Sequence, residues 1–535
     1  MMFQTFLCLF VKGFFVEPQA AEKALTSCLR EIINSFYNTR ITEVGLGPVI
    51  QAGLDALKNS ERSGKLFIFH SSLPTLAAPG QLKNREERKL LGTDKEKTVL
   101  TPAVDFYGKT WRRLCKNMVV QLMFIYFPNC FIDVASISPA DQDGVRFLSD
   151  LRHGISREIA FDVMLRLRTS TGIRPTGFFG NFYMQNTTDV ELSAIDSDKS
   201  VQIEIKYDDK LDEREPAYFQ LAVLFTSCSG QRRLRIHNLS LPVTADYQKA
   251  FDFIQLYRHL DEDCLVSHLF KQAEQSVRDK CPKEMRDELT LRAAQILAAY
   301  REKCSEPAPM GQLILPEFAK LLPLHINCIV RHDSLNGGAE LTVDDRAWMM
   351  SLVPSMTPLA IQQFLYPRIY IITSLCSSVG NSSGSTESLK NDSGCVTKMQ
   401  GSTDFPTPIR ASFDYFSPEE AYLIDNGLVA FIWVGSGVPS SWLNDVFNVN
   451  SIAQLDTEKH QLPFYDNDCS QALRHLWSHL NENRERALKL FIVKEQDALE
   501  SWMKKFLVED RYANNAHSYV DFLCLIHREI RSLIS

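Results

Sequence analysis

The chain has 535 residues, of which 45% are hydrophobic and 23% are charged. At about 150 residues per domain, this length predicts roughly three to four domains, and the composition excludes a disordered chain, a coiled-coil rod and a collagen-like fibre. Lys and Arg number 58 against 65 Asp and Glu, which gives a net charge of −7. An acidic balance argues against a nucleic-acid binder, so no nucleic acid is expected among the partners.

Cysteine spacing and apolar runs limit the class of protein further. Thirteen cysteines are scattered without a C-x-x-C pair, which argues against a structural zinc site and predicts free, mostly buried thiols. No segment reaches the ~20 consecutive apolar residues that a spanning helix needs. The apolar start, residues 1–16, has neither a basic n-region nor an A-x-A cleavage site, so a buried strand is favoured over a signal peptide.

From residue 10 to about 137, short apolar runs alternate with segments of helical periodicity. Such alternation predicts a parallel or mixed sheet that is covered by helices. The expected strands lie at 10–16, 65–70 and 119–127, and the expected helices at 19–37 and 48–56.

Two different patterns follow. From 151 to 243 the hydrophobic period is two, and turn residues separate five strand-like runs, which predicts an antiparallel β-sandwich or barrel. From 246 to 353 the period becomes 3.6, with Pro- and Gly-containing joints, which predicts an all-α helical domain. Its expected helices lie at 247–260, 263–278, 285–303, 316–331 and 344–352.

The last part of the chain begins with a change in composition. Residues 374–404 are rich in Ser, Gly, Thr and Asn, and we expect a flexible loop there. Asn426-Gly427, between two apolar runs, predicts a tight β-hairpin. Further helices are expected at 440–447, 471–486 and 516–535, and a further strand at 488–494.

No catalytic residue and no metal site is predicted. The one G-x-S-x-G match, residues 380–384, lies in the polar loop and not at a strand-to-helix turn. His475 and His479 are four residues apart on an expected helix, but an acidic partner and a third ligand are missing. We therefore favour a solvated helix face over a metal site.

Arginines provide the candidate binding residues. Arg166 and Arg168 alternate on one expected strand, so both side chains leave the same face of the sheet. Two guanidinium groups on one face suit the carboxylates of an acidic peptide; the alternative is a solvent face balanced by Asp and Glu. Arg232, Arg233 and Arg235 form a second cluster, which either touches anionic lipid head groups or caps a sheet edge.

Several segments resemble the cargo-adaptor subunit of the inner COPII coat, the Sec24 family, and most of all its C/D-type branch. Long phrases match in the family's order over about residues 10–535. They include KLFIFHSSLP, APGQLKNREERKLLGTDKEKT, LRLRTSTGIR, LFTSCSGQRRLRIHNLSLP, GQLILPEFAKLLPLHINC, YLIDNGLVAFIWVG and FLVEDRYANNAHSYVDFLCLIHREI.

The resemblance implies a multidomain α+β architecture. It combines a partial α/β trunk of the von Willebrand factor A type, an antiparallel β-sandwich, an all-α helical domain and a gelsolin-like α/β module. The implied boundaries are 1–145 for the C-terminal part of the trunk, 146–245 for the β-sandwich, 246–355 for the helical domain, 356–510 for the gelsolin-like domain with its disordered loop 374–404, and 511–535 for a C-terminal helical segment.

The resemblance also implies a function. A non-enzymatic component of the COPII coat would bind export signals in cargo tails and concentrate cargo for transport from the endoplasmic reticulum to the Golgi. The implied partners are the Sec23 subunit, the small coat GTPase, the cytosolic tails of cargo membrane proteins and SNAREs, and a membrane surface. The implied location is cytoplasmic, peripheral on exit-site membrane and COPII vesicles. In the family the arginine pair belongs to a cargo pocket, so Arg166 and Arg168 become the cargo-peptide-binding candidates.

The sequence departs from the family at its start. The Pro/Gln-rich tail, the zinc-ribbon module and the first half of the trunk are absent upstream of residue 1, so we expect an N-terminally truncated chain without a cofactor. Sec23 docking, which the family places on the trunk, is the function most affected. The alternatives are the GTPase-activating sister subunit, a non-functional fragment of the adaptor and, from residues 405–510 alone, a gelsolin-like actin binder.

Overall fold

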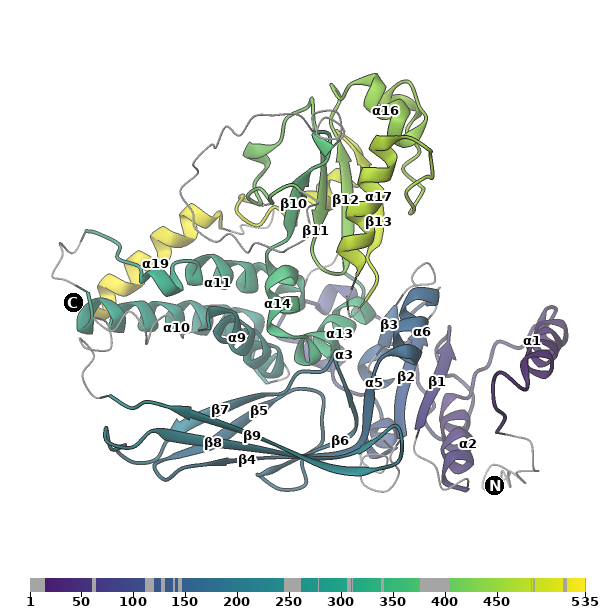
Figure 1. The fold of residues 1–535 in the computed structure, drawn as a ribbon, viewed down its shortest axis with the longest axis horizontal. Helices are drawn as coiled ribbons and strands as arrows, with labels where there is room; N and C mark the ends of the chain where they lie inside the picture. Colours follow the sequence, from purple (N-terminus) through teal and green to yellow (C-terminus); the bar gives the residue numbers. More distant parts are fainter. Residues whose placement is uncertain are drawn as a thin grey trace.

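A computed structural model gives the architecture of the chain (Figure 1). The expected helix at 247–260 lies outside the described residues, as do residues 10–14 of the first expected strand and most of the expected loop. The structure describes residues 15–534 except 60–63, 111–119, 127–129, 138–139, 143–146, 245–260, 278, 306–308, 310, 338–340, 376–404, 483, 485 and 513–516.

The first part of the chain contains a parallel three-stranded sheet in the order β1-β2-β3. Its strands are β1 (Gly64–His70), β2 (Val120–Tyr126) and β3 (Ala140–Gln142), so the strands expected at 65–70 and 119–127 are confirmed. Helix α1 stands apart from the sheet (Figure 1) and buries none of its residues. The helices of this part include α1 (Glu22–Phe36), α2 (Leu46–Asn59), α3 (Lys97–Leu100), α5 (Val134–Ile137) and α6 (Phe147–Ser156).

Two antiparallel sheets follow and form the expected sandwich. The larger sheet has the order β6-β4-β8-β9, and the smaller sheet pairs β5 with β7. A separate hydrophobic core, formed by Val163, Leu165, Val190 and Leu192, lies on the inner face of the larger sheet. The strands are β4 (Ile159–Thr169), β5 (Ile173–Phe179), β6 (Asp189–Asp196), β7 (Gln202–Tyr207), β8 (Ala217–Ser227) and β9 (Arg232–Leu241).

The helical domain differs from the expectation at two helix starts. Helix α10 begins three residues early, because Cys281 and Glu284 form a capping box in front of Met285. The single helix expected over 316–331 is wrong: a short 3₁₀ turn is followed by a separate helix with Pro323 in its first turn, where a missing N–H costs nothing. The helices are α9 (Glu262–Ser276), α10 (Pro282–Lys303), α11 (Leu322–Arg331), α12 (Asp333–Asn336), α13 (Val343–Leu352) and α14 (Pro358–Leu365).

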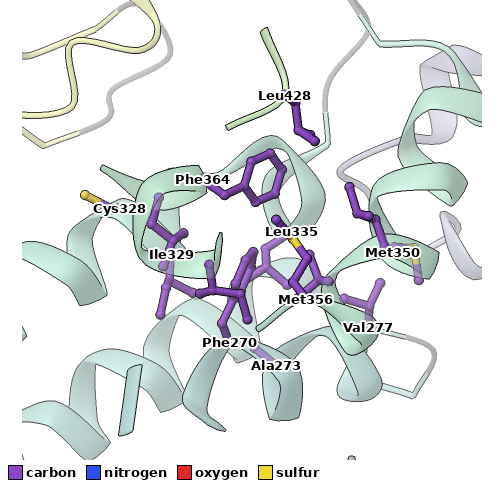
Figure 2. Packing of buried hydrophobic residues seen from close by; sticks show 14 of the residues in the cluster. Phe270, Ala273, Val277, Cys328, Ile329, Leu335, Met350, Met356, Phe364 and Leu428 are labelled. Carbon is purple, nitrogen blue, oxygen red and sulfur yellow. The ribbon is translucent and has the colours of Figure 1, made fainter. Parts of the chain in front are cut away.

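The core of the helical domain continues into the next domain. Figure 2 shows Phe270 of α9 and Phe364 of α14 in one cluster, with Leu428 of the gelsolin-like hairpin above Phe364. Leu428 and Phe364 are both buried and belong to one hydrophobic cluster. The hairpin tip is therefore fixed against the helical domain.

The gelsolin-like module is a sheet in the order β10-β11-β12-β13. The predicted hairpin is confirmed: the Asn426 side chain accepts hydrogen bonds from the backbone N–H groups of Leu428 and Val429, and Gly427 has a positive φ of 89°. Helix α17 starts three residues early, because Asn467 caps it. The elements are β10 (Arg368–Ile371), β11 (Ala421–Asp425), β12 (Val429–Val434), α16 (Ser440–Phe447), α17 (Asp468–Asn481), β13 (Lys489–Lys494) and α18 (Glu500–Lys504).

The last helix, α19 (Tyr519–Ile534), lies along α10 and α11 rather than on the gelsolin-like sheet (Figure 1). Its buried residues Phe522, Ile526 and Ile530 are spaced four apart and face the helical domain core. Within the described part of the chain, no helix is long and apolar enough to cross a bilayer.

The expectation of mostly buried thiols is wrong. Among the eight free cysteines that the structure describes, Cys328 alone is buried, and five are exposed. Cys469 is disulfide-bonded. A small apolar side chain tolerates exposure at little cost, so the sequence pattern did not determine thiol burial.

Candidate peptide-binding surface

Strand β4 places Arg166 and Arg168 on one face of the larger sheet, as predicted. Exposure alternates along the strand, so Val163 and Leu165 are buried while Met164 and both arginines are exposed. A β-bulge between Phe161 and Met164, with Asp162 at a φ of 48°, precedes this regular stretch. The two guanidinium groups therefore project from the outer face.

Arg166 already holds a carboxylate. It lies opposite Asp189 of β6, and its Nε and Nη2 atoms donate to the two carboxylate oxygens. Asp189 is buried and also accepts a hydrogen bond from Asn186 Nδ2 at 2.9 Å. The hydrogen bonds from Arg166 and Asn186 lower the pKa of Asp189 and keep it ionised. A ligand carboxylate would have to compete with Asp189 for Arg166.

Arg168 has a different environment. It lies opposite Gln220 of β8, and its Nη1 atom is 3.5 Å from Gln220 Oε1, the limit of a hydrogen bond. Gln220 in turn donates to Asn238 Oδ1 on β9 at 3.1 Å. Among the described residues, no carboxylate lies within ion-pair distance of Arg168. Arg168 is therefore the arginine of the pair whose charge is available.

A groove with a volume of about 590 Å³ runs beside Arg168 across β4, β8 and β9. Tyr218, which is 53% exposed, stands on its wall. A mainly apolar hollow with a few polar groups is the usual form of a ligand site. The groove is lined by Arg168, Thr169, Ser170, Tyr218, Phe219, Gln220, Asn238, Leu239 and Ser240.

An apolar patch lies next to the groove on the same outer face. Met164 of β4 is in register with Leu224 of β8, which is in register with Leu234 of β9. Ile236 follows Leu234 on the same face, and Met164, Leu234 and Ile236 are between 39% and 60% exposed. Exposed apolar side chains beside an available cation suit a peptide that carries both aliphatic and acidic residues.

Comparison with known proteins places this architecture in a family. Family models match as the Sec23/Sec24 trunk domain over residues 2–142, the Sec23/Sec24 beta-sandwich domain over 160–244, the Sec23/Sec24 helical domain over 261–363 and the gelsolin repeat over 402–477. The crystal structure of the human COPII-coat protein Sec24c matches with a TM-score of 0.86 and 41% identity, covering 98% of this chain and 69% of that one. This chain belongs to the Sec24 family.

The relatives confirm the predicted branch of the Sec24 family. Human protein transport protein Sec24C is 42% identical and human Sec24D is 38% identical, each over 98% of this chain. Protein transport protein SEC24 B of Arabidopsis thaliana is 30% identical over 96% of the chain. The alignments cover 46%, 49% and 46% of these three relatives, so the chain spans about half their length.

In this Sec24-family chain, the three arginines of the second cluster lie on β9 but point to different faces of the sheet. Arg232 lies on the outer face and pairs with Asp162 at 2.6 Å, whereas Arg233 and Arg235, one and three residues later, leave the opposite face. The prediction of one three-arginine cluster is therefore wrong, because successive strand residues alternate. Contact of Arg233 and Arg235 with anionic lipid stays a prediction.

Sequence reasoning missed the groove residues of this Sec24-family chain other than Arg168. Strand register brings Asp189 to Arg166, Gln220 to Arg168 and Asn238 to Gln220, and no local pattern specifies this register. The histidine pair does share a helix face, but both rings stack on Phe405, with ring centroids 5.5 and 4.5 Å away. Within the described residues, no three metal-ligating side chains lie together.

Proposed function

We propose that this chain is a component of the COPII vesicle coat that binds export signals in the cytosolic tails of cargo proteins. It would concentrate this cargo for transport from the endoplasmic reticulum to the Golgi and would act without enzymatic activity. The observation that carries the proposal is the groove beside Arg168, with its available cation and the apolar patch on the same face. Membership of the Sec24 family supports the transport role.

Within this proposal the two arginines have different roles. Arg168 binds a carboxylate of the signal peptide, and the apolar patch contacts its aliphatic side chains. Arg166 positions β4 against β6 through Asp189, whose carboxylate neutralises the charge of its guanidinium group. Signal affinity should therefore depend more on Arg168 than on Arg166.

The experiment is fluorescence anisotropy with a labelled decapeptide that carries leucine and glutamate residues. We expect Arg168→Glu to weaken peptide binding by about tenfold or more, since it removes a charged hydrogen bond and adds repulsion. Arg174→Glu is the matched control, because Arg174 is an exposed arginine on β5 of the other sheet. Equal affinities of wild type and Arg168→Glu would refute the proposed site.

The partners proposed on family grounds are the Sec23 subunit, the small coat GTPase, SNARE tails and the membrane surface, with a cytoplasmic, peripheral location. Sec23 is the partner to test first, by co-elution with this chain in size-exclusion chromatography. Stimulation of GTP hydrolysis by this chain alone would favour the sister-subunit alternative instead.

A further inference from the structure

Helix α1 leaves its apolar face exposed in the described structure. The helix stands apart from the β1-β2-β3 sheet (Figure 1) and buries none of its residues. Nine of the 26 exposed large hydrophobic residues that the structure describes lie within 15–41, so exposed apolar surface is concentrated on α1 and its flanks. The apolar face of α1 consists of five residues that are between 42% and 64% exposed, namely Leu25, Leu29, Ile32, Ile33 and Phe36.

The spacing within this apolar face indicates that a helix covers it. Four of the residues follow one another in steps of four, three and four positions, namely Leu25, Leu29, Ile32 and Phe36. This is the a/d spacing of a heptad repeat, which forms a narrow seam between two helices. Ile33 lies beside the seam and widens it on one side.

Helix α1 also depends on a partner for its stability. It has only 15 residues, and its N-cap residue Ala21 makes no side-chain capping hydrogen bond. An isolated helix of this length is marginal in water, because most of the stability of an amphipathic helix comes from packing of its apolar face. A second helix on the seam would supply this packing.

The charges of α1 favour a second copy of the same helix as this partner. The positions that flank the seam carry no charge, so two copies meet without repulsion between like charges. These flanking residues are Thr26, Cys28, Ile33 and Ser35. The helix contains two acidic and two basic residues, and it therefore lacks the cationic polar face that suits an anionic bilayer surface.

We propose that α1 pairs antiparallel with α1 of a second copy of this chain and so makes the protein a homodimer. Antiparallel pairing aligns the helix dipoles favourably, and it directs the two chain bodies, which follow the C-terminal end of α1, to opposite ends of the pair. Leu25 then lies level with Phe36 of the second copy, and Leu29 lies level with its Ile32.

The apolar face is large enough for such a dimer. Covering five side chains with about 100 Å² of exposed surface each, in both copies, removes roughly 1,000 Å² from water, the lower limit for a specific interface. The proposal uses no residue of the groove beside Arg168, so it does not rest on the proposed function.

The experiment is sedimentation equilibrium of the full chain over micromolar concentrations. We expect the mass to rise from 60.9 kDa towards twice this value. Leu29→Glu should weaken association by about tenfold or more, because it places an unpaired carboxylate in the seam. Ser27→Glu is the matched control: it adds the same charge to the opposite, exposed face of α1 and should associate like wild type.

Complementary variants test the antiparallel register. Ile32→Lys should associate as weakly as Leu29→Glu. An equimolar mixture of these two variant chains should form a heterodimer, because the register places the introduced carboxylate level with the introduced amine. The thermal midpoints of the dilute variants should equal that of the dilute wild-type chain, since α1 contributes no residue to the large hydrophobic core.

The proposal is overturned if the wild-type chain stays monomeric, or if Leu29→Glu associates as tightly as wild type. It is equally overturned if Ser27→Glu weakens association as much as Leu29→Glu, or if the mixture of complementary variants stays monomeric. Binding of a monomeric wild-type chain to phosphatidylcholine vesicles, lost in Leu29→Glu, would assign the apolar face to a bilayer and would also overturn it.

Discussion

Arg166 and Arg168 are two residues apart on β4 and have the same type of side chain, but their neighbours differ. Asp189 faces Arg166 across the ladder, and Gln220 faces Arg168. A bidentate pair with a buried carboxylate fixes the first guanidinium group in place. The neutral amide of Gln220 lies at the limit of hydrogen-bond distance and leaves the guanidinium group of Arg168 available. The identity of one cross-strand residue therefore decides which arginine can bind a ligand.

Asp344 is a single residue whose titration should make the stability of the chain depend on pH. This carboxyl group accepts hydrogen bonds from the backbone N–H groups of Ile132 and Val134 at 2.6 and 2.8 Å, and burial raises its pKa to about 6. An unfolded Asp titrates near 3.8, so the folded state holds the proton more tightly. The contribution of Asp344 to the free energy of unfolding is therefore greatest below pH 3.8 and is lost as pH rises to about 6.

Asp344→Asn should remove this pH-dependent contribution to the free energy of unfolding. Two pKa units correspond to roughly 3 kcal/mol, so between pH 4 and 6 the free energy of unfolding should rise more steeply with pH in the variant than in wild type. Urea unfolding across this range is the measurement. Parallel pH profiles for the two proteins would contradict the role assigned to Asp344.

At the scale of elements, a buried ion pair joins the trunk to the helical domain. Arg346 of α13 donates from Nε and Nη2 to Glu96 Oε1 at 3.0 and 2.6 Å, and both side chains are almost completely buried. The two residues are 250 positions apart in the chain. This pair fixes the loop before α3 against α13, in the same region where Asp344 holds the loop before α5.

Arg346→Met should destabilise the chain by roughly 3–5 kcal/mol, because it leaves the Glu96 carboxylate buried without a counter-charge. The double variant Glu96→Met/Arg346→Met should recover much of this loss, since no uncompensated charge remains. Urea midpoints of the two single variants and the double variant form a double-mutant cycle. Additive losses would show that the pair is not coupled.

Across the whole molecule, hydrophobic cores and domains do not coincide. One cluster includes Ile50 of the trunk, Leu297 of the helical domain, Phe431 of the gelsolin-like module and Ile526 of α19. The β-sandwich has its own smaller cluster around Leu165. A shared core couples the unfolding of the elements that line it, whereas a separate core permits independent opening.

Hydrogen exchange should reveal this division. Leu297→Ala, a fully buried position, should cost about 2–5 kcal/mol and speed exchange in the trunk, the helical domain and the gelsolin-like sheet together. Leu165→Ala should speed exchange in β4, β6 and β8 and leave the other domains protected. Loss of protection throughout the chain in Leu165→Ala would contradict separate cores.

Local sequence patterns by themselves determined most element types, and the resemblance of long segments determined the family of this chain. Period-two alternation placed Arg166 and Arg168 on one face, and Asn426-Gly427 predicted its hairpin, because both features depend on neighbouring residues only. Helix starts were less certain, since a cap such as Cys281 or a proline such as Pro323 acts over one turn.

Tertiary structure alone decided which site residues act together. Register brought Asp189 to Arg166 and Gln220 to Arg168. Domain packing carried α19 away from the gelsolin-like sheet and onto α10 and α11. Contacts between residues as far apart as Arg166 and Asp189, at 23 positions, or Glu96 and Arg346, at 250, depend on the complementarity of whole surfaces, which no short segment of sequence encodes.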